Sequence, residues 1–198
     1  MIARRDGMPV LIAPEHSTPN FSPDRHVPNL ALLRWLCAGL ALTGGAASVG
    51  TAGAQLPDAI TALDAVPLLS LHAEGAQIYE CKIGSDGKLA WTFREPIASL
   101  MLNGRAVGRH YAGPTWEYAD GSAVQAKAVG NAPGGTAGDI AWLKLEVIER
   151  HGSGALAEAD IVQRINTAGG VLHGACEWVG ALRSVPYSAD YVFRRKYR

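Results

Sequence analysis

The sequence lacks the short motifs that identify the common reaction types. Its six histidines form no His-x-His or His-x-x-x-His pair, and no serine lies in a Gly-x-Ser-x-Gly elbow. Lysine plus arginine and aspartate plus glutamate number 18 each, so no positive excess marks a nucleic-acid surface. After residue 54, no apolar run approaches the roughly 20 residues of a membrane helix. These absences disfavour nucleic acid as a partner. They also disfavour a transmembrane segment in residues 55–198.

Residues 30–54 have the composition of an export signal. A weakly basic approach leads into an apolar run from Trp35 to Leu42, and Ala52-Gly53-Ala54 fits the small-x-small rule of signal peptidase just before Gln55. The alternative is a disordered tail rich in alanine and glycine. We therefore expect residues 1–54, an N-terminal extension plus signal peptide, to be removed. Residues 55–198 then form a single domain that is secreted or periplasmic.

Cysteine is scarce, with three in the chain, and Cys37 lies within the predicted signal. Cys81 and Cys176 remain, an even number in an oxidising compartment, so a disulfide between them is the default prediction. Such a bond closes a loop of roughly 95 residues and contributes on the order of 4 kcal/mol in the chain-entropy model. A thiolate metal ligand or a nucleophile is the alternative, but no second cysteine stands at Cys-x-x-Cys spacing.

Turn dipeptides and alternating side chains predict an all-β fold. Asp86-Gly87, Asn103-Gly104 and Asp120-Gly121 are hairpin signals, because these pairs readily adopt the positive φ angles of a type I′ turn. Apolar residues alternate with polar ones on either side, as in Leu89 to Phe93 and in Tyr187 to Phe193. About nine or ten short strands with tight turns predict an antiparallel β-sandwich or small barrel.

The segment from Gly108 to Glu117 is the strongest candidate for a ligand site. His110, Tyr111, Trp116 and Glu117 lie around the corner Gly113-Pro114, and such a set binds a sugar or polyphenol by stacking and hydrogen bonding. The competing interpretation makes Tyr111 and Trp116 core anchors. Because Trp116 alternates with Tyr118 before a tight turn, we expect its ring in the core, with His110 and Glu117 exposed.

Other pairings of polar residues are weaker. A glycosidase pair of Glu117 and Asp120 points to opposite faces if the strand continues, and no metal site is indicated, because His72, His110 and His173 come from three separate segments. No cofactor is predicted. Arg164 and Asp190 are expected to form a structural ion pair across neighbouring strands.

Four blocks resemble a family catalogued as domain of unknown function 3455. They are Ala76–Cys81, Gly108–Glu117 with Asp120–Ser122, Ile165–Gly170 and Val185–Tyr191. The resemblance covers roughly residues 60–194, with one departure: Ala141 precedes Trp142 where the family tends to have proline. It implies a secreted or envelope protein of bacteria or fungi without an established activity.

The functional expectation is therefore a secreted or periplasmic non-catalytic module of the cell envelope, with a binding or structural role. Its partner would be a small molecule or a cell-envelope component. The alternative is an extracellular hydrolase that acts on a polymeric or phenolic substrate through His110 and Glu117.

Overall fold

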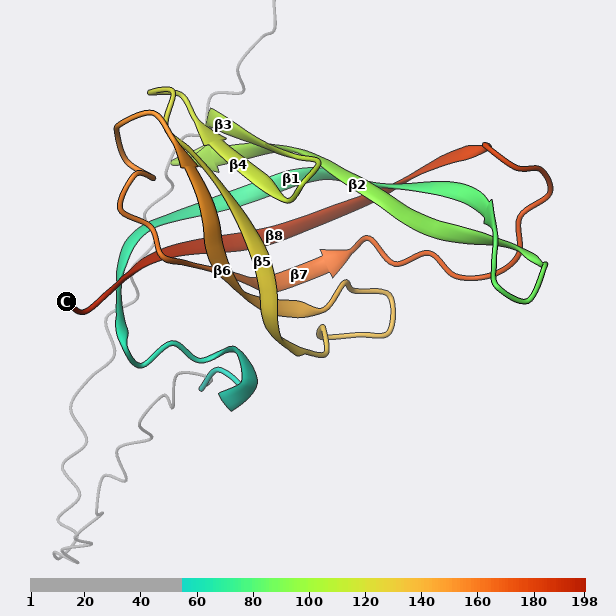
Figure 1. The fold of residues 1–198 in the computed structure, drawn as a ribbon, viewed down its shortest axis with the longest axis horizontal. Coiled ribbons are helices and arrows are strands. Elements are labelled where there is room, and N and C mark those ends of the chain that lie inside the picture. The colour runs from blue at the N-terminus through green and yellow to red at the C-terminus, as the bar shows by residue number, and fades with distance from the viewer. Residues whose placement is uncertain (1–54) are drawn as a thin grey trace, which may run out of the picture. The chain divides into compact units, whose positions relative to one another are not determined.

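The computed structural model describes residues 55–198 as a single antiparallel sheet that closes on itself (Figure 1). After the short 3₁₀ helix η1 (Asp58–Ile60), each strand pairs with the next, and the last pairs with the first. The strands are β1 (Ala65–Ile83), β2 (Leu89–Leu102), β3 (Arg105–Tyr111), β4 (Thr115–Tyr118), β5 (Ala123–Ala132), β6 (Trp142–His151), β7 (Ile161–Gly169) and β8 (Leu182–Lys196). The all-β prediction is confirmed, in its barrel form. The predicted export signal lies outside the described residues.

The barrel has eight strands rather than the nine or ten expected, because two expected strands are halves of β2. The alternation of buried residues changes phase inside β2: Leu89 and Trp91 precede Pro96, whereas Ala98 and Leu100 follow it. The register against β1 shifts at Ile78/Tyr79, so the strand absorbs this change of phase without a break. The change in the phase of apolar and polar residues along the sequence therefore marks a bulge within β2, and not a turn between two strands.

The predicted turns are confirmed as hairpin connections. Asn103 and Gly104 have φ angles of 51° and 75°, the two successive positive values of a type I′ turn between β2 and β3. Gly87 and Gly121, with φ of 76° and 85°, lie in the β1–β2 and β4–β5 connections. Gly113, with φ of 89°, lies in the connection between β3 and β4. These dipeptides fix which strands are neighbours.

The barrel core is built from inward-facing residues, which occupy every second position along a strand. On β8 the residues Tyr187, Ala189, Tyr191 and Phe193 are all buried, as their alternation predicts. They pack with Trp116 and with aliphatic side chains from other strands. This core occupies the part of the molecule where all eight strands are present.

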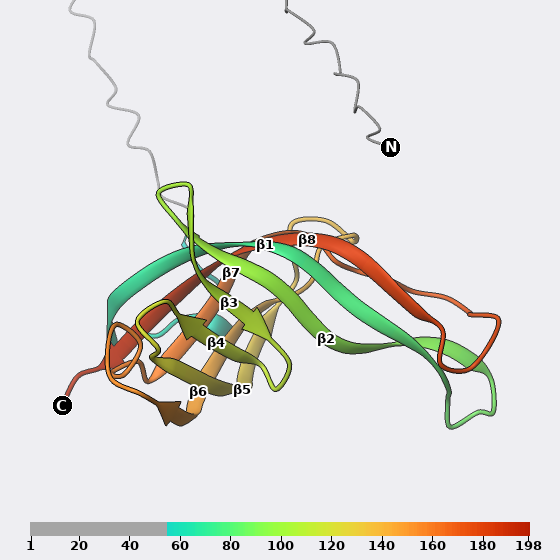
Figure 2. The ribbon, with the colours of Figure 1, turned by 90° about the horizontal axis from the view of Figure 1, so that it is seen from above.

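The long strands β1, β2 and β8 continue beyond the other five (Figure 2). We call this part the three-stranded extension; it comprises residues 79–83, 89–93 and 182–185. The predicted disulfide is confirmed: Cys81 on β1 is bonded to Cys176 in the β7–β8 loop, with Cα atoms 5.9 Å apart. Cys81 is fully buried. The bond fastens that loop to the extension.

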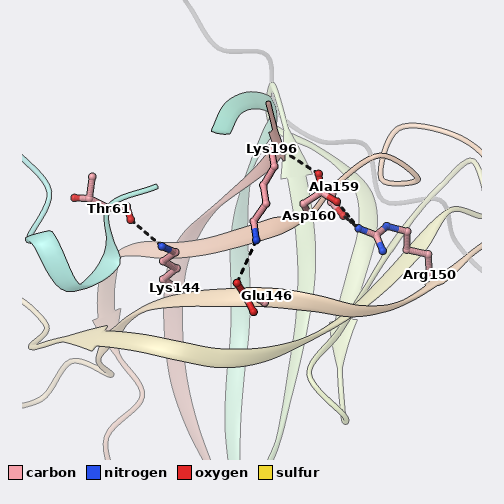
Figure 3. Close-up of polar contacts among 7 residues, drawn as sticks. All are labelled: Thr61, Lys144, Glu146, Arg150, Ala159, Asp160 and Lys196. Atoms are coloured by element: carbon pink, nitrogen blue, oxygen red, sulfur yellow. Dashed lines mark hydrogen bonds and ion pairs between the residues drawn. The ribbon is translucent and has the colours of Figure 1, made fainter. Parts of the chain in front are cut away.

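A group of ion pairs and hydrogen bonds ties β6 to its neighbours (Figure 3). Arg150 Nη2 lies 2.7 Å from Asp160 Oδ1, and Lys196 Nζ lies 3.2 Å from Glu146 Oε1. Lys144 Nζ donates to the Thr61 carbonyl at 3.1 Å, which holds the segment after η1 against the barrel. Each of these three cations thus has an acidic or a carbonyl partner.

None of the helices in the part of the chain that the structure describes is long and apolar enough to cross a membrane.

Candidate functional site

The hairpin from Gly108 to Glu117 divides the predicted site residues between the two faces of the sheet. His110 on β3 pairs in register with Trp116 on β4, and both point into the barrel, with exposed fractions of 3% and 1%. Tyr111 and Glu117 occupy the alternate positions and point outward. The four residues of the candidate ligand site therefore do not project from one face of the sheet.

The outward pair belongs to a closed polar cluster. Arg109 Nη2 donates to both carboxylate oxygens of Glu117, at 3.0 and 2.8 Å, and the Tyr111 hydroxyl donates to Oε2 at 3.0 Å. The Arg109 guanidinium also lies 5.1 Å from the centre of the Tyr111 ring. The hydrogen bond from Arg109, followed by that from Tyr111, lowers the pKa of Glu117. The Glu117 carboxylate and the Tyr111 hydroxyl are thus already engaged with their neighbours on the outer face.

The inward pair forms an aromatic stack within the barrel. The His110 ring lies parallel to that of Trp116 at 4.4 Å, and Tyr191 meets both rings edge-on at 5.0 and 5.2 Å. His110 was expected to be exposed, and this expectation is wrong. Alternation along β4 alone does not determine which face His110 of β3 occupies. The register of the hairpin places His110 directly opposite Trp116, on the same face.

The chemistry of His110 follows from its burial. Its Nδ1 lies 2.8 Å from the Thr115 carbonyl, which can only accept, so Nδ1 carries the proton of the neutral ring. Burial lowers the pKa of His110 to about 4. The nearby charge of Arg164 acts in the same direction, while the hydrogen bond to Thr115 opposes it. At neutral pH, Nε2 is therefore an uncharged acceptor.

A cavity of about 800 Å³ begins at this stack and reaches the base of the three-stranded extension. Its walls come from β1 to β8 and from the β7–β8 loop that the disulfide fastens. Most of the lining is apolar or aromatic, and includes Trp116, Ile140, Leu143, Leu145, Val171 and Leu172. Its volume lies within the roughly 300–1,000 Å³ that is typical of small-molecule sites.

The predicted ion pair between Arg164 and Asp190 is wrong. Arg164 pairs in register with Tyr191 and lines the cavity, where its Nε donates to the Ala141 carbonyl at 3.0 Å. Asp190, one position away, points outward and accepts hydrogen bonds from His72 Nδ1 and Asn166 Nδ2, both at 2.8 Å. The two residues lie on adjacent strands, but their side chains project from opposite faces of the sheet.

Of the three histidines considered for a metal site, two line the same cavity. His72 lies on the outer face with Asp190, whereas His110 lines the cavity from the aromatic stack and His173 from an exposed position on the β7–β8 loop. Among residues 55–198, no group of three or more histidine, cysteine, aspartate or glutamate side chains could hold a metal ion. The described side chains thus offer an apolar cavity rather than a ligand set for a metal.

Several cavity residues escaped the sequence analysis. Gln77 on β1 and Tyr191 on β8 line the cavity, together with the aliphatic side chains of β6. Their inward phase was readable from the alternation along each strand. The sequence does not show which inward positions face a cavity and which fill the core, because that depends on the taper and closure of the barrel.

Comparison with known proteins adds a family but no activity. A family model described as a protein of unknown function (DUF3455) matches residues 62–105 and 101–195. Together these segments span nearly all of the described barrel. No curated protein and no solved structure matches the chain.

Proposed function

This chain belongs to the DUF3455 family of proteins of unknown function, and we propose that it is a secreted or periplasmic, non-catalytic module that binds a small apolar ligand. The observation that carries the proposal is the open cavity of about 800 Å³ where the three-stranded extension joins the barrel. The cavity is lined mainly by apolar side chains and opens to solvent at exposed residues such as Phe93 and Ile148, which is the usual form of a small-molecule site. A cavity of this size therefore favours a binding role over a structural one.

The chemistry of the cavity wall supports binding rather than catalysis. Among residues 55–198, the lining includes no serine, threonine, cysteine, aspartate or glutamate, so it offers neither the usual nucleophiles nor a carboxylic acid. A hydrolase that works through His110 and Glu117 is disfavoured, because these side chains lie on opposite faces of the sheet.

Export is supported by two independent features of the chain. The predicted signal peptide directs the protein out of the cytoplasm, and the Cys81–Cys176 disulfide is typical of an oxidising compartment. A ligand-binding module of the cell envelope is consistent with both.

The test is saturable binding of a neutral hydrophobic dye, N-phenyl-1-naphthylamine, to the purified protein. Ala128 lines the cavity at an exposed position on β5, so Ala128→Trp should fill the cavity entrance and weaken dye binding at least tenfold. Val129, the next residue, is 51% exposed and does not line the cavity, so Val129→Trp is the matched control and should bind as the wild type does. Absence of saturable binding to the wild type, or equal losses in both variants, would refute the proposal.

A further inference from the structure

The cavity has an unbalanced charge. Three cations, Arg94, Lys127 and Arg164, line it, whereas no aspartate or glutamate among residues 55–198 does so. Arg94 is paired outside the cavity with Glu95 at 3.1 Å, and Lys127 is exposed. Arg164 is the inner cation, half-buried among apolar and aromatic side chains on β6, β7 and β8.

Arg164 has no carboxylate partner among residues 55–198. Its Nε is satisfied by the Ala141 carbonyl, which fixes the planar head, but its Nη groups meet no aspartate or glutamate within ion-pair distance. Arg150, by contrast, has a carboxylate partner, because its Nη2 lies 2.7 Å from Asp160 Oδ1 (Figure 3). An unpaired guanidinium beside an apolar cavity is costly, and an anion in that cavity would relieve the cost.

The cavity wall around Arg164 holds two hydrogen-bond donors that lack an acceptor, beside one uncharged acceptor, His110 Nε2. Trp116 Nε1, which can only donate, is buried in the cavity wall without an acceptor, and Gln77 Nε2 is in the same condition. The Tyr191 hydroxyl lies 3.5 Å from the Tyr187 hydroxyl, and burial raises its pKa against the smaller opposing effects of Arg164 and of the hydrogen bond to Tyr187. A ligand that supplies oxygen acceptors fits this surplus better than one that supplies donors.

The remainder of the cavity restricts the rest of the ligand. Leu143 and Leu145 on β6 continue the wall beside Arg164, and Val171 and Leu172 close it from the β7–β8 loop. Such a lining favours hydrocarbon and has no acidic group to repel a negative charge. The matching ligand therefore has one acidic group and an apolar body.

We propose that the ligand is a monocarboxylic acid with an apolar body, bound with its carboxylate on the Arg164 guanidinium and its hydrocarbon part against β6 and the β7–β8 loop. A guanidinium meets a carboxylate through two parallel hydrogen bonds, which gives orientation as well as affinity. This inference rests on the proposed binding function and adds to it the chemical class of the ligand.

The experiment compares acids with alcohols of the same shape. Binding of decanoic acid and 1-decanol, and of 2-naphthoic acid and 2-naphthalenemethanol, is measured at pH 7.5 by displacement of N-phenyl-1-naphthylamine from the purified protein. The acid of at least one pair should bind ten times or more tightly than its alcohol. Equal affinity within both pairs would overturn the inference but leave the proposed function standing, whereas absence of binding by all four compounds and the dye would refute the proposed function itself.

Variants then assign the preference to one side chain. Arg164→Gln should abolish the preference for the acid while the alcohol still binds, because the cavity keeps its apolar lining. Arg183→Gln removes the same charge from an exposed position on β8 outside the cavity and should retain the preference. A preference that survives in Arg164→Gln would contradict the assignment. If that variant does not fold, Arg164→Lys serves instead, and a preference equal to that of the wild type would contradict the bidentate pairing.

Discussion

His110 and Trp116 stack on one another and both line the cavity, but they differ in hydrogen bonding. The histidine is held neutral by burial and is satisfied through Nδ1, whereas the indole N–H has no acceptor within residues 55–198. The indole thus combines a large apolar contact with an unsatisfied donor. The stack is both part of the core and the inner wall of the cavity.

Trp116→Ala should destabilise the protein by about 3–5 kcal/mol, the usual cost of removing a buried large aromatic side chain. The ring packs against His110, Tyr191 and Phe193, all of which would lose contact. Urea unfolding monitored by circular dichroism measures the change. The control is Trp178→Ala, because Trp178 is 63% exposed and its removal should cost little. Similar losses in the two variants would contradict the assignment of Trp116 to the core.

The burial of His110 predicts a dependence of stability on pH. Its folded pKa of about 4 lies below the ordinary value of 6.5, so between these values the unfolded state binds more protons than the folded state. This contribution to the free energy of unfolding is fully present above pH 6.5 and falls by on the order of 3 kcal/mol as the pH drops to 4. Urea unfolding at several pH values measures the loss.

The contribution of His110 to this pH dependence can be isolated with a pair of variants. His110→Gln should flatten the dependence between pH 4 and 6.5, whereas His151→Gln, at an exposed position beside Glu149, should leave it unchanged. The pKa values of Asp120 and Asp139 are lowered by hydrogen bonds, so these carboxylates affect stability at lower pH, below about 3.8. A wild-type loss that persists in His110→Gln would place its origin elsewhere.

At the scale of secondary structure elements, strand length decides where the cavity lies. β1 has 19 residues and β8 has 15, whereas β4 has only four. The long strands form the three-stranded extension beyond the barrel, and the β7–β8 loop runs from the barrel to that extension. Gly75 permits the close approach of β1 and β2, because a Cβ there would overlap the Ile97 carbonyl and Ala98. The cavity occupies the place where the extension joins the barrel.

Removal of the disulfide should act on stability and on the cavity together. Cys81→Ala with Cys176→Ala should lower the free energy of unfolding by about 2–5 kcal/mol, the usual range for a small exported domain. Val171, Leu172 and His173 of the cavity wall lie in the loop that the bond fastens, so dye affinity should also fall. Urea unfolding and dye titration give the two readings, and reduction of the wild type with dithiothreitol is the matched control. An unchanged dye affinity would show that the loop is positioned without the bond.

At the scale of the whole molecule, closure of the sheet leaves no unpaired strand edge in the barrel, since β8 pairs with β1. The family match covers this closed unit, and the predicted export signal precedes it. The proposed export leads us to expect that cleavage would leave this closed unit as the mature protein.

Mass spectrometry of the protein recovered from an exporting host should therefore find a mature N-terminus within a few residues of Gln55. The small residues Ala52 and Ala54 before that position fit the recognition rule of signal peptidase. Ala54→Asp is a useful variant, because a charged residue in place of the small one should block or shift cleavage. Protein that retains residues 30–54 after export would contradict the predicted processing.

Local chemistry in the sequence determined most of the elements. The Asn-Gly and Asp-Gly pairs located three hairpins, alternation along β8 identified four core residues, and the two remaining cysteines identified the disulfide. These features depend on φ preference, on the two-residue period of a strand and on the even number of thiols, all of which can be read from neighbouring residues.

Only the tertiary structure decided the candidate site. The direct pairing of His110 with Trp116 moved the histidine into the core, and the adjacent registers of Arg164 and Asp190 placed them on opposite faces. A shift of one residue in register turns a side chain from one face to the other, and local sequence does not specify register across strands. The cavity beside Arg164 arises only when eight strands close, because its walls come from residues far apart in the chain.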